Sequence, residues 1–203
     1  MILIKLAILI SGSLYAGILP YTLWKSIKHI EYDPSKQTLS YLSIRDMYGD
    51  KFRKGYSWLL FSAAALTYIF FVLLSEFYCL GEYDRFIEYI NYCSFYFVVL
   101  AFIPLNLYPY KKENVKHNIR RILHNVFAAL VFVTLAALVV LFHIATYEEH
   151  PVFGLIGLLI IGLTVAVMIW SIIKNSLNGF SELIFINGIG IWSIFVTVMT
   201  MLL

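Results

Sequence analysis

The stretch LNLYPYKKENVKHNIRRILHN, residues 105–125, separates two apolar runs and decides how the chain is organised. The first apolar run stops at Pro109, five basic residues follow between Lys111 and Arg121, and the chain becomes apolar again around His124. Short basic segments between apolar runs are typical of the cytoplasmic loops of membrane proteins. The stretch therefore predicts two membrane-spanning helices joined by a basic loop.

The composition of the whole chain supports this interpretation. Apolar residues make up 61% of it and charged residues only 13%. Soluble domains are usually about 45–50% apolar and about 25% charged. A soluble fold could not bury this much apolar surface, so we expect the chain to lie in a bilayer.

Six segments approach the roughly 20 residues that a helix needs to cross about 30 Å of hydrocarbon. They cover residues 2–24, 56–80, 92–110, 122–145, 152–173 and 183–203. The third is the least regular, because Pro104, Asn106 and Pro109 interrupt its end. Lipid cannot satisfy backbone polar groups, and the segments are apolar all round, which favours helices over a barrel. We predict an all-α, polytopic integral membrane protein with a single domain, residues 1–203, built as a six-helix transmembrane bundle.

Charge predicts the orientation of this bundle. Thirteen of the fifteen lysines and arginines lie in the loops 25–55 and 111–121 and at Lys174, whereas only Lys5 and Arg85 lie on the opposite side. The positive-inside rule places the basic loops in the cytoplasm and both termini outside. The first segment also resembles a cleavable signal peptide, but cleavage would export the most basic loop, so we expect an uncleaved helix.

The basic side also predicts the partners. Each base near an anionic membrane surface contributes about 1 kcal/mol, so we expect membrane lipids with anionic headgroups at the cytoplasmic face. Topology explains the bases, so we expect no nucleic acid. A homo-oligomer or a cytoplasmic protein partner stays open.

The first cytoplasmic loop, residues 25–55, is longer than a plain connector. Ser43 and Asp46 have the spacing of a helix cap. The apolar and aromatic residues that recur at helical spacing are Tyr41, Ile44, Tyr48 and Phe52. We predict a short helix in the membrane interface, and a disordered basic loop is the alternative.

The two cysteines, Cys79 and Cys93, lie on the predicted outer side and flank one short loop. In an oxidising compartment they are candidates for a disulfide. The alternative is two small buried apolar side chains.

Motifs for catalysis or metal binding are missing. The sequence has no HExxH, no CxxC pair, no GxSxG, no Walker loop and no strand-linked dinucleotide fingerprint. The cluster of His143, Glu148, Glu149 and His150 is more typical of a solvated acidic loop than of a metal site. We assign no catalytic residue and expect no metal and no cofactor.

Polar residues near the cytoplasmic ends of the helices are the best site candidates. They are Asn106, His124, Asn125, Glu182 and Asn187. The expected orientation puts all five in one half of the membrane, where they could form a polar pocket that binds a ligand. We expect His124 and Glu182 to lie within reach of each other, directly or through water. Helix-end capping and interhelical hydrogen bonds are the alternative explanation.

The order of several short motifs resembles a known group of membrane proteins. These motifs are TLSYLSIRDMYGD (residues 38–50), LYPY (107–110), RRILHNVFAALVFV (120–133) and NGFSELIFINGIGIW (178–192). They are similar to the DUF998 family and its wider relatives, the Frag1/DRAM/Sfk1-like six-helix membrane proteins. The matching polar positions are Ser40 or Ser43, Pro109, His124 and Glu182. The chain departs from the pattern with Lys111 after the LYPY motif and with Leu183 after Glu182.

This resemblance implies a fold and a lipid-adjacent role, but no reaction. We therefore expect a membrane protein, leaning towards a non-enzymatic one, that binds or moves a lipid or small amphiphile, in the inner membrane of a bacterium. One alternative is an oligomeric pore or membrane-perturbing effector that works with a soluble cytoplasmic partner. Another is a lipid-modifying enzyme that uses His124.

Overall fold

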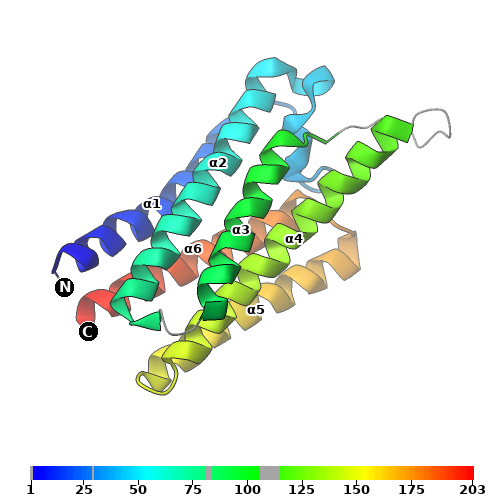
Figure 1. The fold of residues 1–203 in the computed structure, drawn as a ribbon. Helices are drawn as coiled ribbons and strands as arrows, with labels where there is room; N and C mark the ends of the chain where they lie inside the picture. The colour runs from blue at the N-terminus through cyan, green and yellow to red at the C-terminus, as the bar shows by residue number, and fades with distance from the viewer. Residues whose placement is uncertain (1, 29, 81–83, 106–114) are drawn as a thin grey trace.

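The computed structural model describes residues 2–28, 30–80, 84–105 and 115–203, and this part of the chain contains helices and no strand (Figure 1). The elements are α1 (Ile2–Ile27), the short 3-10 helix η1 (Leu39–Ser43), α2 (Arg45–Phe77), α3 (Asp84–Phe102), α4 (Val115–Thr146), α5 (Pro151–Asn175) and α6 (Gly179–Leu202).

The helices form a bundle in which each packs against its neighbours in chain order, and α1 packs against α6. Both termini lie at one end of the bundle, together with the ends of α2 and α4 (Figure 1). η1 and the start of α2 lie at the opposite end, which we call the basic end because it carries the basic loop, residues 25–55.

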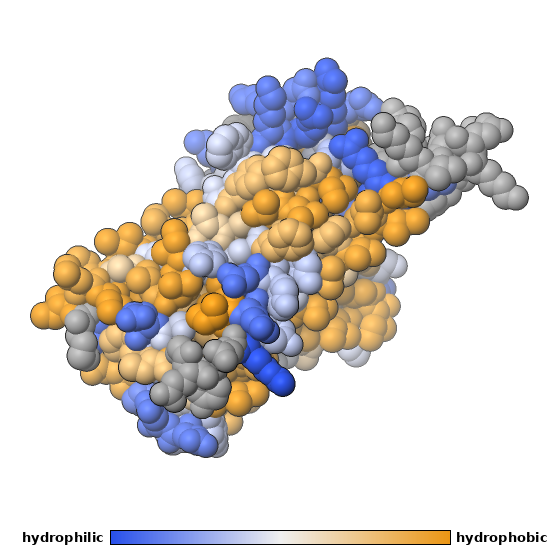
Figure 2. Space-filling view, in the orientation of Figure 1, coloured by the Kyte–Doolittle hydropathy of each residue, from blue (hydrophilic) through white to orange (hydrophobic). Residues whose placement is uncertain are grey.

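Five helices are long and apolar enough to span a membrane: α1, α2, residues 118–146 of α4, α5 and α6. Large apolar side chains on their outer faces are exposed, as expected for contact with lipid. Figure 2 shows hydrophobic side chains over much of this face of the bundle and hydrophilic ones gathered where α2 begins, with further hydrophilic ones toward the opposite end. The chain is therefore an integral membrane protein with a helical bundle fold.

The sixth helix, α3, is not one of these five spans. It begins at Asp84, eight residues before the predicted start at residue 92, and its first turns contain Arg85 and Glu88. It also ends at Phe102, ahead of Pro104. The predicted range 92–110 did not include these charged first turns, and they lower the mean hydropathy of the helix.

The earlier start of α3 changes the position of one cysteine. Cys93 lies nine residues after the first residue of α3, or about 13 Å along the helix, and is buried. Cys79 is exposed just after α2. A disulfide needs Cα atoms about 4.4–6.8 Å apart. The structure therefore does not form the candidate bridge, and both cysteines are free thiols, with only Cys93 buried as the alternative had it.

The first loop also differs from its prediction. The expected interfacial helix is divided into η1 and the first turn of α2, which is broken at Gly49, where φ is 85° and only glycine fits easily. Ser43 does not cap α2: its hydroxyl donates to the carbonyl of Ser40 at 2.6 Å and accepts from the backbone N–H of Leu105 at 2.8 Å. Ser43 thus joins this loop to the end of α3.

A cluster of aromatic rings fills the core on the side of the bundle where both chain termini lie. Trp192 stacks on Phe71, with ring centroids 5.3 Å apart, and its indole N–H donates a 2.6 Å hydrogen bond to Nε2 of His143. Gly157 of α5 packs directly against the His143 ring, where a Cβ atom would overlap it. The glycine therefore lets α5 approach α4 and cover the histidine.

Candidate functional site

A cavity of about 120 Å³ lies between α1, α2, α3, α4, α6 and η1, toward the basic end, and we call it the inner cavity. Its wall is almost entirely aliphatic and aromatic, with contributions such as Leu60, Val131 and Phe185. The polar side chains in the lining are Tyr15, Ser40, Tyr56 and Glu182. Apart from Tyr15, they belong to η1, to the first half of α2 and to the first turn of α6.

Glu182 is the charged residue of this lining and is only 6% exposed. It lies in the first turn of α6, which begins with a capping box: Asn178 accepts from the backbone N–H of Ser181, and the Ser181 hydroxyl accepts from the N–H of Asn178. A carboxylate is favoured at this position by the partial positive charge of a helix N-terminus. Its Oε2 atom accepts a hydrogen bond from the backbone N–H of Leu39. The ion pairs between described residues do not involve Glu182.

Residues 32–43, which we call the loop cap, lie across the start of α6. The backbone N–H of Gly179 donates to the carbonyl of Gln37 at 2.8 Å, and that of Phe180 donates to the carbonyl of Pro34 at 3.2 Å. The first turn of a helix has free N–H groups that need partners. The loop cap supplies carbonyl partners for two of these N–H groups. Its Leu39 and Ser40 also form part of the wall of the inner cavity.

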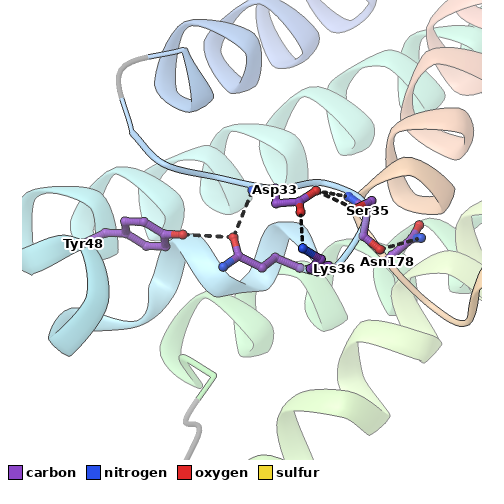
Figure 3. Close-up of polar contacts among 6 residues, drawn as sticks. Asp33, Ser35, Lys36, Tyr48 and Asn178 are labelled. Carbon is purple, nitrogen blue, oxygen red and sulfur yellow. Dashed lines mark hydrogen bonds and ion pairs between the residues drawn. The ribbon is translucent and has the colours of Figure 1, made fainter.

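Polar contacts also hold the loop cap together (Figure 3). Asp33 accepts hydrogen bonds from the backbone N–H and hydroxyl of Ser35, at 2.9 and 2.6 Å, and these bonds lower the pKa of its carboxyl. The side chain of Asn178 donates to the carbonyl of Ser35 at 3.2 Å. Tyr48 donates from α2 to the side chain of Gln37 at 3.0 Å. The loop cap is thus anchored to both α2 and α6.

A second cavity of about 510 Å³, the side cavity, adjoins the first. Ser40, Ala128, Phe132 and Glu182 line both cavities. The side cavity is otherwise formed by residues of the loop cap, α4, α5 and the segments that follow α3 and α5. Because Glu182 and Ser40 stand between the two spaces, a molecule could place an apolar part in one and a polar part in the other.

His124 of α4 lines the side cavity and is 1% exposed. Its Nδ1 atom is hydrogen-bonded to the carbonyl oxygen of Ile103, just past the end of α3. Its Nε2 atom is buried and makes no hydrogen bond with any residue that the structure describes. Among the described residues, this ring therefore has one hydrogen-bond partner, at Nδ1, and none at Nε2.

The structure brings some of the predicted site residues together. His124, Asn125 and Glu182 all line the side cavity. His124 and Glu182 are not hydrogen-bonded to each other, and each is bonded to a backbone group elsewhere. Contact through water, the other form of the expected pairing, stays a prediction. Asn187 is exposed, and its side chain donates to the carbonyl of Leu183 in its own helix at 2.8 Å. Asn106 lies outside the described residues.

Sequence reasoning missed two parts of the site. Tyr56 was taken as the first residue of an apolar segment, yet its hydroxyl lies 3.2 Å from that of Ser40. The backbone of Leu39 was not considered, although it supplies the hydrogen bond to Glu182. The spacing of Tyr56, Leu60 and Ala63 on one face of α2 was the available signal for Tyr56.

The comparisons with known proteins gave no match: no family model, no curated protein and no solved structure is similar to this chain at a significant level.

Proposed function

We propose that the protein binds a single-chain lipid or a similar small amphiphile, with the apolar chain in the inner cavity and the polar head beside Glu182 and Ser40. The observation that carries this proposal is an apolar cavity in the bundle whose polar groups, apart from Tyr15, lie toward one end. A polar end and an apolar wall match the two parts of an amphiphile.

The size of the inner cavity agrees with an apolar guest. An engineered cavity of about 150 Å³ lined by Leu, Ile and Phe in another protein stays free of water and binds benzene. The inner cavity, at about 120 Å³, has room for a hydrocarbon group of comparable volume. The remainder of a longer chain and the head would occupy the side cavity.

The orientation belongs to the same proposal. The basic loops would face the cytoplasm and both termini would lie outside, in the plasma membrane of a bacterium. Exposed Lys25 and Lys28 lie over the rings of Tyr21 and Trp24, with 6.0 and 5.1 Å from nitrogen to ring centroid, as is usual for residues at a membrane interface. The loop cap would then control access from the cytoplasmic leaflet. The resemblance to the DUF998 group points in the same direction.

The test of this proposal fills the inner cavity. Ala63 of α2 lines it, whereas Ala65 on the same helix is exposed. Native mass spectrometry of the purified protein, with stepwise removal of detergent, measures the amphiphile that stays bound. We expect Ala63→Phe to lose it and the matched control Ala65→Phe to retain it. The milder variant Ala63→Leu covers the case in which Phe prevents folding. Equal retention by the folded Ala63 and Ala65 variants would contradict the proposal.

A further inference from the structure

We infer that the bound amphiphile has a head that donates hydrogen bonds, such as a hydroxyl or ammonium group, and that His124 and Glu182 accept them. This inference rests on the proposed function and adds the chemical class of the ligand. It follows from the hydrogen-bonding state of the two side chains that line the side cavity.

The first step concerns the tautomer of His124. The carbonyl oxygen of Ile103 can only accept, so Nδ1 of His124 must carry the proton in their hydrogen bond. In a neutral imidazole the other nitrogen, Nε2, is then an acceptor. This atom is buried and has no partner among the described residues. A buried acceptor without a partner costs free energy, so a donor in the cavity would be bound favourably.

The second step concerns Glu182. A carboxylate only accepts hydrogen bonds, and it can take more than one. Among the described residues, the Leu39 N–H is the donor that reaches it, and it bonds to Oε2. Glu182 therefore offers further acceptor capacity on the wall that the two cavities share.

The groups around this wall favour a donor over an anion. An anionic head would place its negative charge beside the Glu182 carboxylate and its lone pairs against Nε2 of His124. The hydroxyls of Ser40 and Tyr56, 3.2 Å apart, can turn to suit either head. Arg121 also lines the side cavity, and an anion held by its guanidinium group is the competing outcome. Arg121 already has an interaction partner of its own.

The experiment compares heads on one dodecyl chain. Tritium-labelled monododecanoylglycerol, a monoacylglycerol with a twelve-carbon chain, is bound to the protein in lipid nanodiscs. The pH is 8, where an ordinary imidazole with a pKa of about 6.5 is neutral. Unlabelled competitors with the same chain carry a hydroxyl, an ammonium, a carboxylate or a phosphate head. We expect the hydroxyl and ammonium compounds to compete at roughly tenfold lower concentration than the two anions, the factor that one well-made hydrogen bond to a buried group supplies.

Two variants of His124 separate binding from structure. His124→Asn keeps a nitrogen donor at the δ position for Ile103 and removes the acceptor at the ε position, so it should lose the preference for donor heads while staying folded. His124→Gln keeps an acceptor at the ε position and should retain the preference. His150→Asn is the control, because His150 is partly buried at the other end of the bundle, against the rings of Tyr78 and Phe153.

The outcomes distinguish this inference from the proposed function. Stronger competition by the anions, or no difference between heads, would overturn the inference and leave amphiphile binding in place. A preference for donor heads that His124→Asn keeps would also overturn it. Saturable binding of none of the compounds would overturn both the inference and the proposed function.

Discussion

The side-chain carboxyl of Glu182, in the first turn of α6, accepts a hydrogen bond from the backbone N–H of Leu39, the first residue of η1. Both residues line the inner cavity. This bond therefore joins the wall of the cavity to the loop cap that closes over the start of α6.

Removal of this carboxyl should loosen the loop cap. Glu182→Ala leaves the buried N–H of Leu39 without a partner, which costs about 1–3 kcal/mol of folding free energy. We also expect faster modification of Ser40→Cys by a maleimide in a Cys79→Ser background, because Ser40 is a buried residue of the closed loop cap. Asn187→Ala, an exposed position on the same helix, is the control and should change neither quantity. An unchanged labelling rate in Glu182→Ala would show that the bond does not hold the loop cap.

The contact between Trp192 and His143 should be important for stability. Trp192→Phe keeps the ring in the aromatic core but leaves Nε2 of His143 without its donor, which we expect to cost about 1–3 kcal/mol. Trp170→Phe on the lipid-facing side of α5, where the residue is 69% exposed, should cost little. Thermal unfolding in detergent measures both. His143→Phe in the Trp192→Phe background should recover part of the loss, and strict additivity would mean that the two side chains do not interact.

The packing of α5 against α4 depends on one glycine. Gly157→Ala would place a methyl group within the His143 ring, so we expect a loss of about 1–3 kcal/mol from overpacking. Gly162 lies on the same helix with open space around its Cα, so Gly162→Ala is the matched control. Similar melting temperatures for the two variants would contradict the close approach of these helices.

The orientation can be tested with single cysteines. In a background with Cys79→Ser and Cys93→Ser, we expect Glu148→Cys to react with a membrane-impermeant maleimide added to intact cells. Lys36→Cys in the loop cap should react only after the cells are opened, because the basic loops are expected in the cytoplasm. Both positions are exposed in the structure, so accessibility within the protein does not limit the reaction. Labelling of Lys36→Cys from outside would reverse the orientation.

The bundle could be predicted from the sequence because hydropathy is a local property. The apolar run that ends at Trp24 and the run that begins at Tyr56 match α1 and the membrane part of α2. The boundaries of α3 could not be predicted in this way. Its start at Asp84 extends a helix into a charged turn, and packing of Phe86 and Ile90 in the core supports that turn against its weak apolar character.

The site could be predicted only in part. His124 and Glu182 stood out as polar residues at the ends of apolar segments, and both do line the side cavity. Their hydrogen-bond partners are backbone groups of Ile103 and Leu39. Every residue type except proline carries the same backbone N–H and C=O, so the sequence does not indicate which residue supplies them. The contact of Leu39 with Glu182 also joins positions that are 143 residues apart, which no local pattern encodes.

The most direct test of amphiphile binding in the inner cavity is photo-crosslinking. A dodecyl monoacylglycerol with a diazirine at the end of its chain is irradiated with the protein in nanodiscs, and the modified residues are mapped by mass spectrometry. We predict labelling of Leu60, Val131 and Phe185, which line the cavity, and loss of this labelling with excess unlabelled compound. Labelling confined to lipid-facing residues such as Leu163 and Ile173, with no competition by the unlabelled compound, would contradict binding in the cavity.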